Sequence, residues 1–214
     1  MRYILVEVFI IGTKERREKE KESMKNAILE AAIKIIKDEG YDNLTMRKLA
    51  DAIDYTPTAI YSYYKDKAEI VFDISLQLRK KTLSYIKADL EKNKENTVDE
   101  QLKSAFKVFI KCCAEYSEIA SILMRSGTKA IFGLNEEPVP PEENGVLIMN
   151  HYLTLGQQEL IFRKLDDNIS WMLITALIGF AINSIENNLH LSKDWDNLVE
   201  IYAEMLINGI MNNS

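Results

Sequence analysis

The chain has 214 residues, 47% of them hydrophobic and 28% charged, which suffices for one domain or two small ones around an apolar core. With 8 glycines and 4 prolines, the composition suits an all-α fold. The net charge is −6, but residues 1–70 contain 13 basic and 13 acidic residues, so residues 71–214, with 14 and 20, carry the whole excess. The first third is therefore neutral as a whole, so that attraction of a polyanion to it would depend on local clusters of charge and on helix N-termini, and not on a global field.

The first eleven residues, MRYILVEVFII, are apolar and are followed by a basic arm, TKERREKEKES. Glu7 interrupts the apolar run and no small-residue cleavage site follows, so a signal peptide is not expected. The run is also too short to span a bilayer. A flexible tail, a strand-like arm and an upstream translation start stay open as interpretations. We assign residues 1–22 to an N-terminal extension that includes this arm.

An amphipathic scaffold helix is predicted over residues 24–39. Its apolar stripe recurs at helical spacing, and Gly40 is a typical residue to follow a helix end. The stripe consists of Ile28, Ala31, Ala32, Ile35 and Ile36.

Two short helices separated by a turn are predicted within residues 44–67. Thr45 suits the N-cap of the first helix, and Thr56 followed by Pro57 marks the start of the second. Ile60 and Tyr64 lie four residues apart and are expected to point inward together. This layout is that of a helix-turn-helix, which places its second helix in the major groove of DNA.

Small side chains on the second helix allow a close approach to base edges, and hydroxyl and cationic groups around it can bind phosphates. A plain three-helix subdomain that binds no nucleic acid is the alternative. The candidate DNA-binding residues are Thr45, Arg47, Thr56, Pro57, Thr58, Ala59, Tyr61, Ser62, Tyr63 and Lys67.

Residues 27–72 resemble the DNA-binding domain of the TetR family of transcriptional regulators. The matching segments are AAIKIIKDEGYDNLTMRKLADAI and TPTAIYSYYKDK. The resemblance implies a homodimeric, all-helical, ligand-responsive regulator that is usually a repressor. It also implies that Thr45 caps a helix and touches phosphate, and that Tyr61, Tyr63 and Lys67 bind phosphates. It places Arg47, Pro57, Thr58 and Ala59 against bases or backbone.

The chain departs from the family at the turn, where Asp54 stands in place of the usual glycine. Asp tolerates the left-handed backbone conformation better than most residues, so the motif is expected to persist.

Helices are predicted throughout the remaining chain, at about 66–91, from Thr97, at about 144–163, at 170–188 and from Asp194. Asp66 with Glu69, and Thr97 with Glu100, have the spacing of a capping box. The segment 133–145, rich in proline and acid, is expected to be a solvated connector. We assign residues 23–70 to the DNA-binding domain, with its helix-turn-helix at about 45–63, and 71–214 to a helical effector-binding and dimerisation domain.

The last two helices are expected to form a dimer interface as a four-helix bundle, although packing within one subunit is an alternative. The apolar run 171–182 is too short to span a membrane. Large apolar side chains of the central helices predict a pocket for a neutral or amphipathic molecule, because no buried charge is evident. Each such residue alone is more often part of a core. The candidates are Phe106, Phe109, Ile110, Tyr116, Met124, Met149, Tyr152, Trp171, Phe180 and Asn183.

Adjacent Cys112 and Cys113 do not suit an ordinary disulfide and are expected to be small buried hydrophobes in a reducing cytosol. The sequence as a whole predicts a cytoplasmic homodimeric regulator that binds a palindromic double-stranded DNA operator. No cofactor, metal or membrane is expected to take part. A helical interaction or scaffolding protein, an enzyme and an activator are the alternatives, and no catalytic constellation favours the enzyme.

Overall fold

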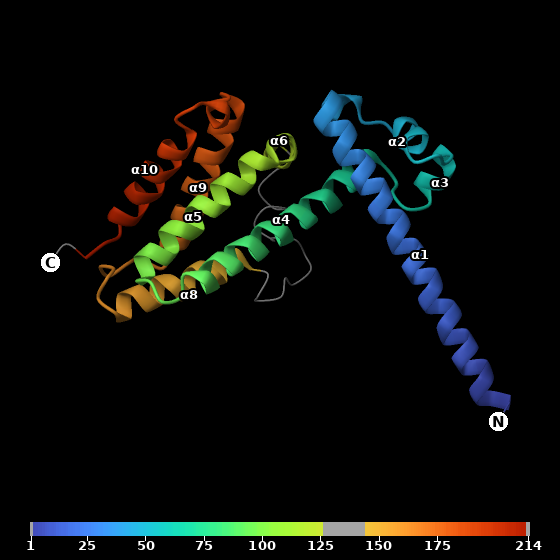
Figure 1. Cartoon of the computed structure of the whole chain (residues 1–214), viewed down its shortest axis with the longest axis horizontal. Helices are drawn as coiled ribbons and strands as arrows, with labels where there is room; N and C mark the ends of the chain where they lie inside the picture. Colours follow the sequence, from blue (N-terminus) through green and yellow to red (C-terminus); the bar gives the residue numbers. More distant parts are fainter. Residues whose placement is uncertain (1, 126–143, 213–214) are drawn as a thin grey trace. The chain divides into compact units, whose positions relative to one another are not determined.

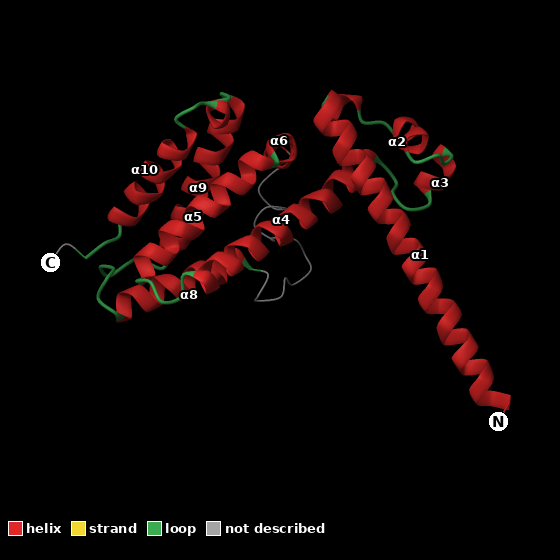
Figure 2. Cartoon of the chain, in the orientation of Figure 1, coloured by secondary structure: helices red, strands yellow, loops and turns green. Residues whose placement is uncertain are grey.

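The structure, a computed structural model, describes the backbone of residues 2–125 and 144–212 and the side chains of residues 15–121 and 144–212. Within these residues every regular element is a helix, and no strand occurs (Figure 2). The predicted all-α fold is therefore confirmed. The chain divides into two compact units, residues 1–74 and residues 75–214, and each is described by itself below.

The first unit comprises α1 (Arg2–Glu39), η1 (Tyr41–Asn43), α2 (Met46–Ala52), α3 (Pro57–Tyr61) and the start of α4 (Lys67–Lys92) (Figure 1). Helix α1 begins at Arg2, so it includes the segment predicted as an extension before residue 24. The basic arm is composed of good helix formers, and an Arg16–Glu20 ion pair at 3.5 Å links successive turns of its exposed surface. These features favour helix where the sequence analysis left the N-terminal segment open.

Helix α1 packs its apolar stripe against η1 and α2. Ile28, Ala32 and Ile36 are fully buried, and so are Leu49 of α2 and Ile60 of α3. Two short helices have little stability alone, so this shared core holds them. After the core segment, α1 ends before Gly40, whose φ of 84° is a conformation that suits glycine.

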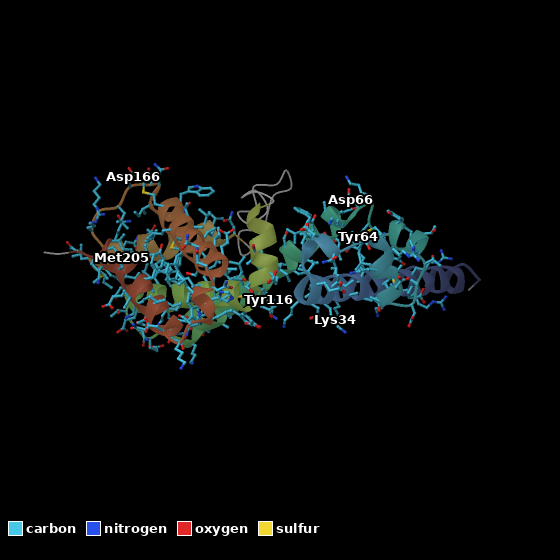
Figure 3. All side chains as sticks on the ribbon, turned by 90° about the horizontal axis from the view of Figure 1, so that it is seen from above. Lys34, Tyr64, Asp66, Tyr116, Asp166 and Met205 are labelled. Carbon is cyan, nitrogen blue, oxygen red and sulfur yellow. The ribbon has the colours of Figure 1, made fainter. Side chains whose placement is uncertain are left out.

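A buried tyrosine joins three segments of the first unit. The Tyr64 hydroxyl donates to Asp73 Oδ2 at 2.9 Å, and Lys25 Nζ lies 3.6 Å from the same oxygen. The Lys25 ammonium also sits 5.1 Å from the centre of the Tyr64 ring. Figure 3 labels Tyr64 among the elements of this unit. Burial, followed by the hydrogen bond to Asp73, raises the pKa of Tyr64.

The second unit contains most of α4, then α5 (Val98–Glu115), α6 (Ser117–Arg125), α8 (Gly145–Gln158), α9 (Ile169–Glu186), η3 (Leu189–Leu191) and α10 (Trp195–Asn208). Helix α5 is central, because it contacts α8, α9 and α10 (Figure 1). Its core residues Phe106 and Ile110 are buried with Leu177 of α9 and Val199 of α10. The predicted connector at 133–145 falls almost wholly in residues 126–143, outside the described part of the chain.

The helix predicted from Thr97 is present, but its capping box is not. Thr97 makes no side-chain cap hydrogen bond, and its carbonyl instead accepts the first backbone bond from Gln101 at 3.0 Å. By contrast, Asp66 Oδ1 accepts from the N–H of Glu69 at 3.0 Å, and Glu69 Oε2 accepts from the N–H of Lys65 at 2.7 Å. The start of α4 is therefore capped as predicted, with the reciprocal bond displaced by one residue.

Helix α9 is, within the described residues, the one helix whose length and composition would allow it to cross a membrane. Its 18 residues exceed the apolar run judged too short from the sequence. Leu173, Leu177 and Ala181 are nevertheless buried in the protein core. Core helices of soluble proteins pass the same test of length and hydropathy, so α9 is weak evidence for a membrane.

Backbone pairing closes the second unit at its C-terminal end. Phe162 pairs with Met211 in an isolated antiparallel bridge, and the N–H of Arg163 donates to the Ile210 carbonyl at 3.1 Å. The Phe162 ring lies directly over Gly156, where a Cβ would overlap the ring. Only glycine at this position of α8 lets Phe162 reach the core.

Candidate nucleic-acid interface and effector cavity

The first helix of the helix-turn-helix, α2, is fixed at both ends by local hydrogen bonds. Thr45 Oγ1 accepts from the N–H of Lys48 at 3.2 Å, which confirms the predicted cap. At the other end Asp54 has a φ of 57°, and the N–H of Tyr55 donates to the Ala50 carbonyl at 2.9 Å. This is the six-to-one bond of a Schellman motif, with Asp in the left-handed position where glycine is usual. Asp54 thus adopts the predicted conformation.

The second helix of the helix-turn-helix, α3, is the candidate recognition helix and begins at Pro57 with Thr56 as its N-cap. Thr56 Oγ1 accepts from the N–H of Ala59 at 3.3 Å, as the Thr-Pro pair predicts. Ile60 is buried, and Tyr64, four residues later, is buried as well, which confirms their inward orientation. With one face anchored in this way, the opposite face of α3 is exposed.

The polar groups of the candidate interface differ in their solvent exposure and in their hydrogen bonds within the protein. Arg47, Thr58 and Tyr61 are exposed, whereas the Ser62 hydroxyl donates to the Ala59 carbonyl at 2.6 Å. Lys67 is half-buried: its Nζ donates to the Tyr41 carbonyl at 3.3 Å and lies 4.1 Å from the centre of the Tyr41 ring. Tyr63 is also half-buried. The exposed groups offer hydroxyls and one guanidinium, which are donors suited to phosphates and base edges.

A cavity of about 160 Å³ lies within the second unit. Its walls come from α4, α5, α6, α8 and α9, and apolar side chains dominate them. The lining residues used below are Ser75, Arg79, Thr82, Leu83, Ile86 and Leu90 of α4, Phe106 and Phe109 of α5, Met149 of α8, and Ile174 and Ile178 of α9.

Phe106, Phe109 and Met149 are the members of the predicted pocket set that line this cavity. The structure places the described others elsewhere. Ile110 lies in the core outside the lining, and Tyr152 packs against that core at the edge of a shallow outer pocket. Phe180 stacks on Tyr202, with ring centres 4.0 Å apart, and so belongs to the α9–α10 contact.

Four further members of the set remain. Tyr116 accepts a hydrogen bond from Lys81 Nζ, and the ammonium lies 4.6 Å from the centre of its ring. Trp171 and Asn183 are exposed on α9. The side chain of Met124 falls outside the described part of the structure.

Helix α4 contributes a wall of the cavity that the apolar side chains of the later helices did not predict. Ser75, Arg79, Thr82 and Ile86 recur at helical spacing, and that periodicity places them on one face. The expectation of a cavity without charge is wrong, because Arg79 lines it. Arg79 Nε is buried, and it has no hydrogen-bond partner among the residues that the structure describes.

The two cysteines lie beside this cavity. Cys112 is buried, and its Sγ lies 3.1 Å from Thr82 Oγ1, while Cys113 contributes to the lining. Burial raises the pKa of Cys113 to about 12, so this thiol is kept in its neutral form. Both cysteines are free and buried, which confirms their interpretation as small hydrophobes.

Comparison with protein-family models identifies the first unit. Residues 28–74 match the model described as bacterial regulatory proteins, tetR family. This match includes α2, the turn and α3 and confirms the resemblance seen in the sequence. No curated protein sequence matches the chain significantly.

Solved structures with the same fold extend over both units. The fatty acid degradation regulator FadR from Bacillus halodurans has a TM-score of 0.67 at 20% identity, over 86% of this chain and 94% of that one. A tetR family regulatory protein from Rhodococcus RHA1 has a TM-score of 0.64 at 19% identity, over 89% and 98%. RolR in complex with resorcinol has a TM-score of 0.65 at 13% identity, over 90% of each chain. At these identities the likeness shows the fold alone.

Proposed function

We propose that this chain, a TetR family transcriptional regulator that binds DNA, acts as a homodimeric repressor released from its operator by a small organic effector. The observation that carries the proposal is the exposed face of α3, which is anchored by Ile60 and Tyr64 and presents Thr58 and Tyr61 outward. The family consists of regulators that are not enzymes, and a cytoplasmic location suits this role.

An exposed apolar surface on α9 and α10 supports a dimer. Met172 on α9 is 63% exposed, and Ile201 and Met205 on α10 are 55% and 56% exposed (Met205 is labelled in Figure 3). Gly179 lies on the same face of α9, two turns after Met172, and has open space around it. Two helices from each of two copies would cover this surface as a four-helix bundle. A two-fold dimer would then read two half-sites about 34–36 Å apart, or a multiple of that distance.

The cavity supports control by a small molecule. RolR, which has the same fold, was solved with resorcinol bound, so this architecture can hold an organic ligand. Helix α4 runs without interruption from Lys67, just after α3, to Lys92, and it forms one wall of the cavity. A ligand that favours a non-binding arrangement of α4 needs a coupling of about 1–3 kcal/mol to act as an inducer.

The direct test is a fluorescence-anisotropy titration of the full chain on its own upstream DNA at two salt concentrations. Arg47→Gln is expected to weaken binding and to reduce the slope of log affinity against log salt by about 0.9, if Arg47 neutralises one phosphate. Tyr61→Ala should weaken binding at both salt concentrations. The matched controls are Arg163→Gln and Tyr85→Ala, which change the same residue types at exposed positions of the second unit. They should leave the DNA affinity and its salt dependence unchanged.

The outcomes separate the alternatives. Unselective, salt-sensitive binding directs the search to an operator elsewhere, by selection from random duplexes. No binding at low salt by folded protein contradicts the proposal and favours the scaffolding protein. Binding by a monomer, measured by sedimentation, contradicts the dimeric part alone.

A further inference from the structure

The cavity of the second unit contains one charged side chain in an apolar wall. Arg79 lies on α4 between Ser75 and Thr82, both of which line the same space. Among the lining residues that the structure describes, no carboxylate accompanies it. The guanidinium is a permanent cation, so this wall carries a positive charge in the ligand-free protein.

The hydrogen-bonding capacity of this guanidinium is not used up. Arg79 Nε is buried, and no described residue accepts a hydrogen bond from it. The other buried orphan of the described chain is Asp89 Oδ2, on the same helix. Ten residues of helix separate the two by roughly 15 Å, so they cannot pair with each other. A buried donor without an acceptor is costly, and a binding partner that supplies an acceptor removes that cost.

The remaining wall is apolar and extends away from Arg79 along α4. Leu83, Ile86 and Leu90 follow on the same face, and the distance from Arg79 to Leu90 is about 16 Å of helix. Phe106 and Met149 enclose this stretch from α5 and α8. The cavity is therefore cationic at one end and apolar along its length, which is the pattern that an amphipathic anion would match.

We propose that the cavity binds an organic monocarboxylate, whose carboxylate pairs with Arg79 and whose apolar chain lies along Leu83, Ile86 and Leu90. The guanidinium presents a fork of N–H donors that a planar carboxylate accepts with two parallel hydrogen bonds. One cation balances one anionic charge. A phosphomonoester carries about −1.5 to −2 at neutral pH and would leave part of its charge buried without compensation. This assignment rests on the proposed effector role of the cavity and names its ligand class.

The test is isothermal titration calorimetry of the full chain with decanoate, 1-decanol and decyl phosphate. Wild-type protein is expected to prefer decanoate to the neutral alcohol. Arg79→Gln should weaken decanoate binding roughly tenfold to a hundredfold, the usual cost of a lost charge-assisted hydrogen bond, and should leave decanol binding unchanged. The control Lys87→Gln removes a positive charge from an exposed position of the same helix and should affect neither ligand.

Four results would overturn the assignment: no binding of decanoate by wild-type protein, unchanged decanoate binding by Arg79→Gln, equal weakening of decanoate and decanol, or a preference for decyl phosphate that Arg79→Gln abolishes. The calorimetry contains no DNA. Decanoate binding without any effect on operator binding would therefore refute the effector role and leave the ligand class standing.

A melting experiment keeps the proposal testable if the glutamine variant binds nothing. Arg79→Met preserves an extended side chain and removes a cation whose buried Nε has no acceptor among the described residues, so ligand-free protein should melt at the same temperature or higher. Decanoate should raise the melting temperature of the wild type but not that of the variant. A lower melting temperature of ligand-free Arg79→Met would show that Arg79 stabilises the fold, and would contradict its role as a carboxylate-binding residue.

Discussion

The starts of the short helices in the first unit and the packing of the long helices in the second unit depend on contacts over different distances along the chain. In the first unit, the cap hydrogen bonds at the starts of α2 and α3 join near neighbours: Thr45 to Lys48, and Thr56 to Ala59. In the second unit, the decisive bonds join remote segments. Lys107 Nζ lies 2.7 Å from Glu200 Oε2, and the Tyr202 hydroxyl donates to the Ala176 carbonyl at 2.7 Å. Near neighbours therefore set where each short helix begins, whereas remote contacts decide which faces of the long helices are covered.

The largest effect is expected at the tightest non-local contact. Gly156→Ala places a methyl group where the Phe162 ring lies, and overpacking of this kind costs about 1–3 kcal/mol. Chemical denaturation of the second unit would measure the loss. Gly145→Ala is the control, because its Cβ would meet only Leu83 Cδ2 at an ordinary 3.6 Å. Equal stability of the two variants would show that Phe162 moves aside freely.

The Tyr64 contact tests the polar joint of the first unit. Tyr64→Phe removes the donor to Asp73 and should cost about 1 kcal/mol near neutral pH. Because the pKa of Tyr64 is raised in the folded protein, its stabilisation is fully present below about pH 10 and is lost as pH rises further. Denaturation of wild type and variant from pH 7 to 11 should therefore show their stabilities converging. A constant difference would contradict the raised pKa.

The same Thr→Ala substitution at one helix start in each unit compares a capped helix with an uncapped one. Thr45→Ala removes a side-chain hydrogen bond from the start of α2 and should destabilise the first unit by about 1 kcal/mol. Thr97→Ala, at the start of α5, removes no such bond and should have a much smaller effect. Thermal melts of both variants decide the matter, and equal losses would mean that Thr97 is capped in solution.

The smallest effect is expected at the turn. Asp54→Gly relieves a left-handed residue with φ of 57°, and the gain should be at most about 1 kcal/mol because glycine also has a more flexible unfolded state. Melting of the first unit would register this as a modest stabilisation. A clear destabilisation would show that the Asp54 side chain has a role beyond its backbone conformation.

Most of the first unit could be predicted from the sequence. Thr45, Thr56, Pro57 and Asp54 act on residues within a few positions of themselves, and Ile60 with Tyr64 reveals the buried face by spacing alone. The capping box expected at Thr97 fails although its spacing is correct, since spacing gives the opportunity for a bond and packing decides whether the bond forms. The cavity was harder to predict: Phe106, Phe109 and Met149 line it, whereas Phe180 stacks between helices instead.

The sequence by itself determined the helical class, the helix-turn-helix and its caps, because hydrophobic period and capping depend on near neighbours. Tertiary structure alone decided which large side chains face the cavity and that Arg79 lines it with an Nε that no described residue pairs. The physical reason is that burial and pairing depend on which remote helix lies opposite. The periodicity of α4 places Arg79 on a face, and only the packing of α5, α8 and α9 makes that face a wall.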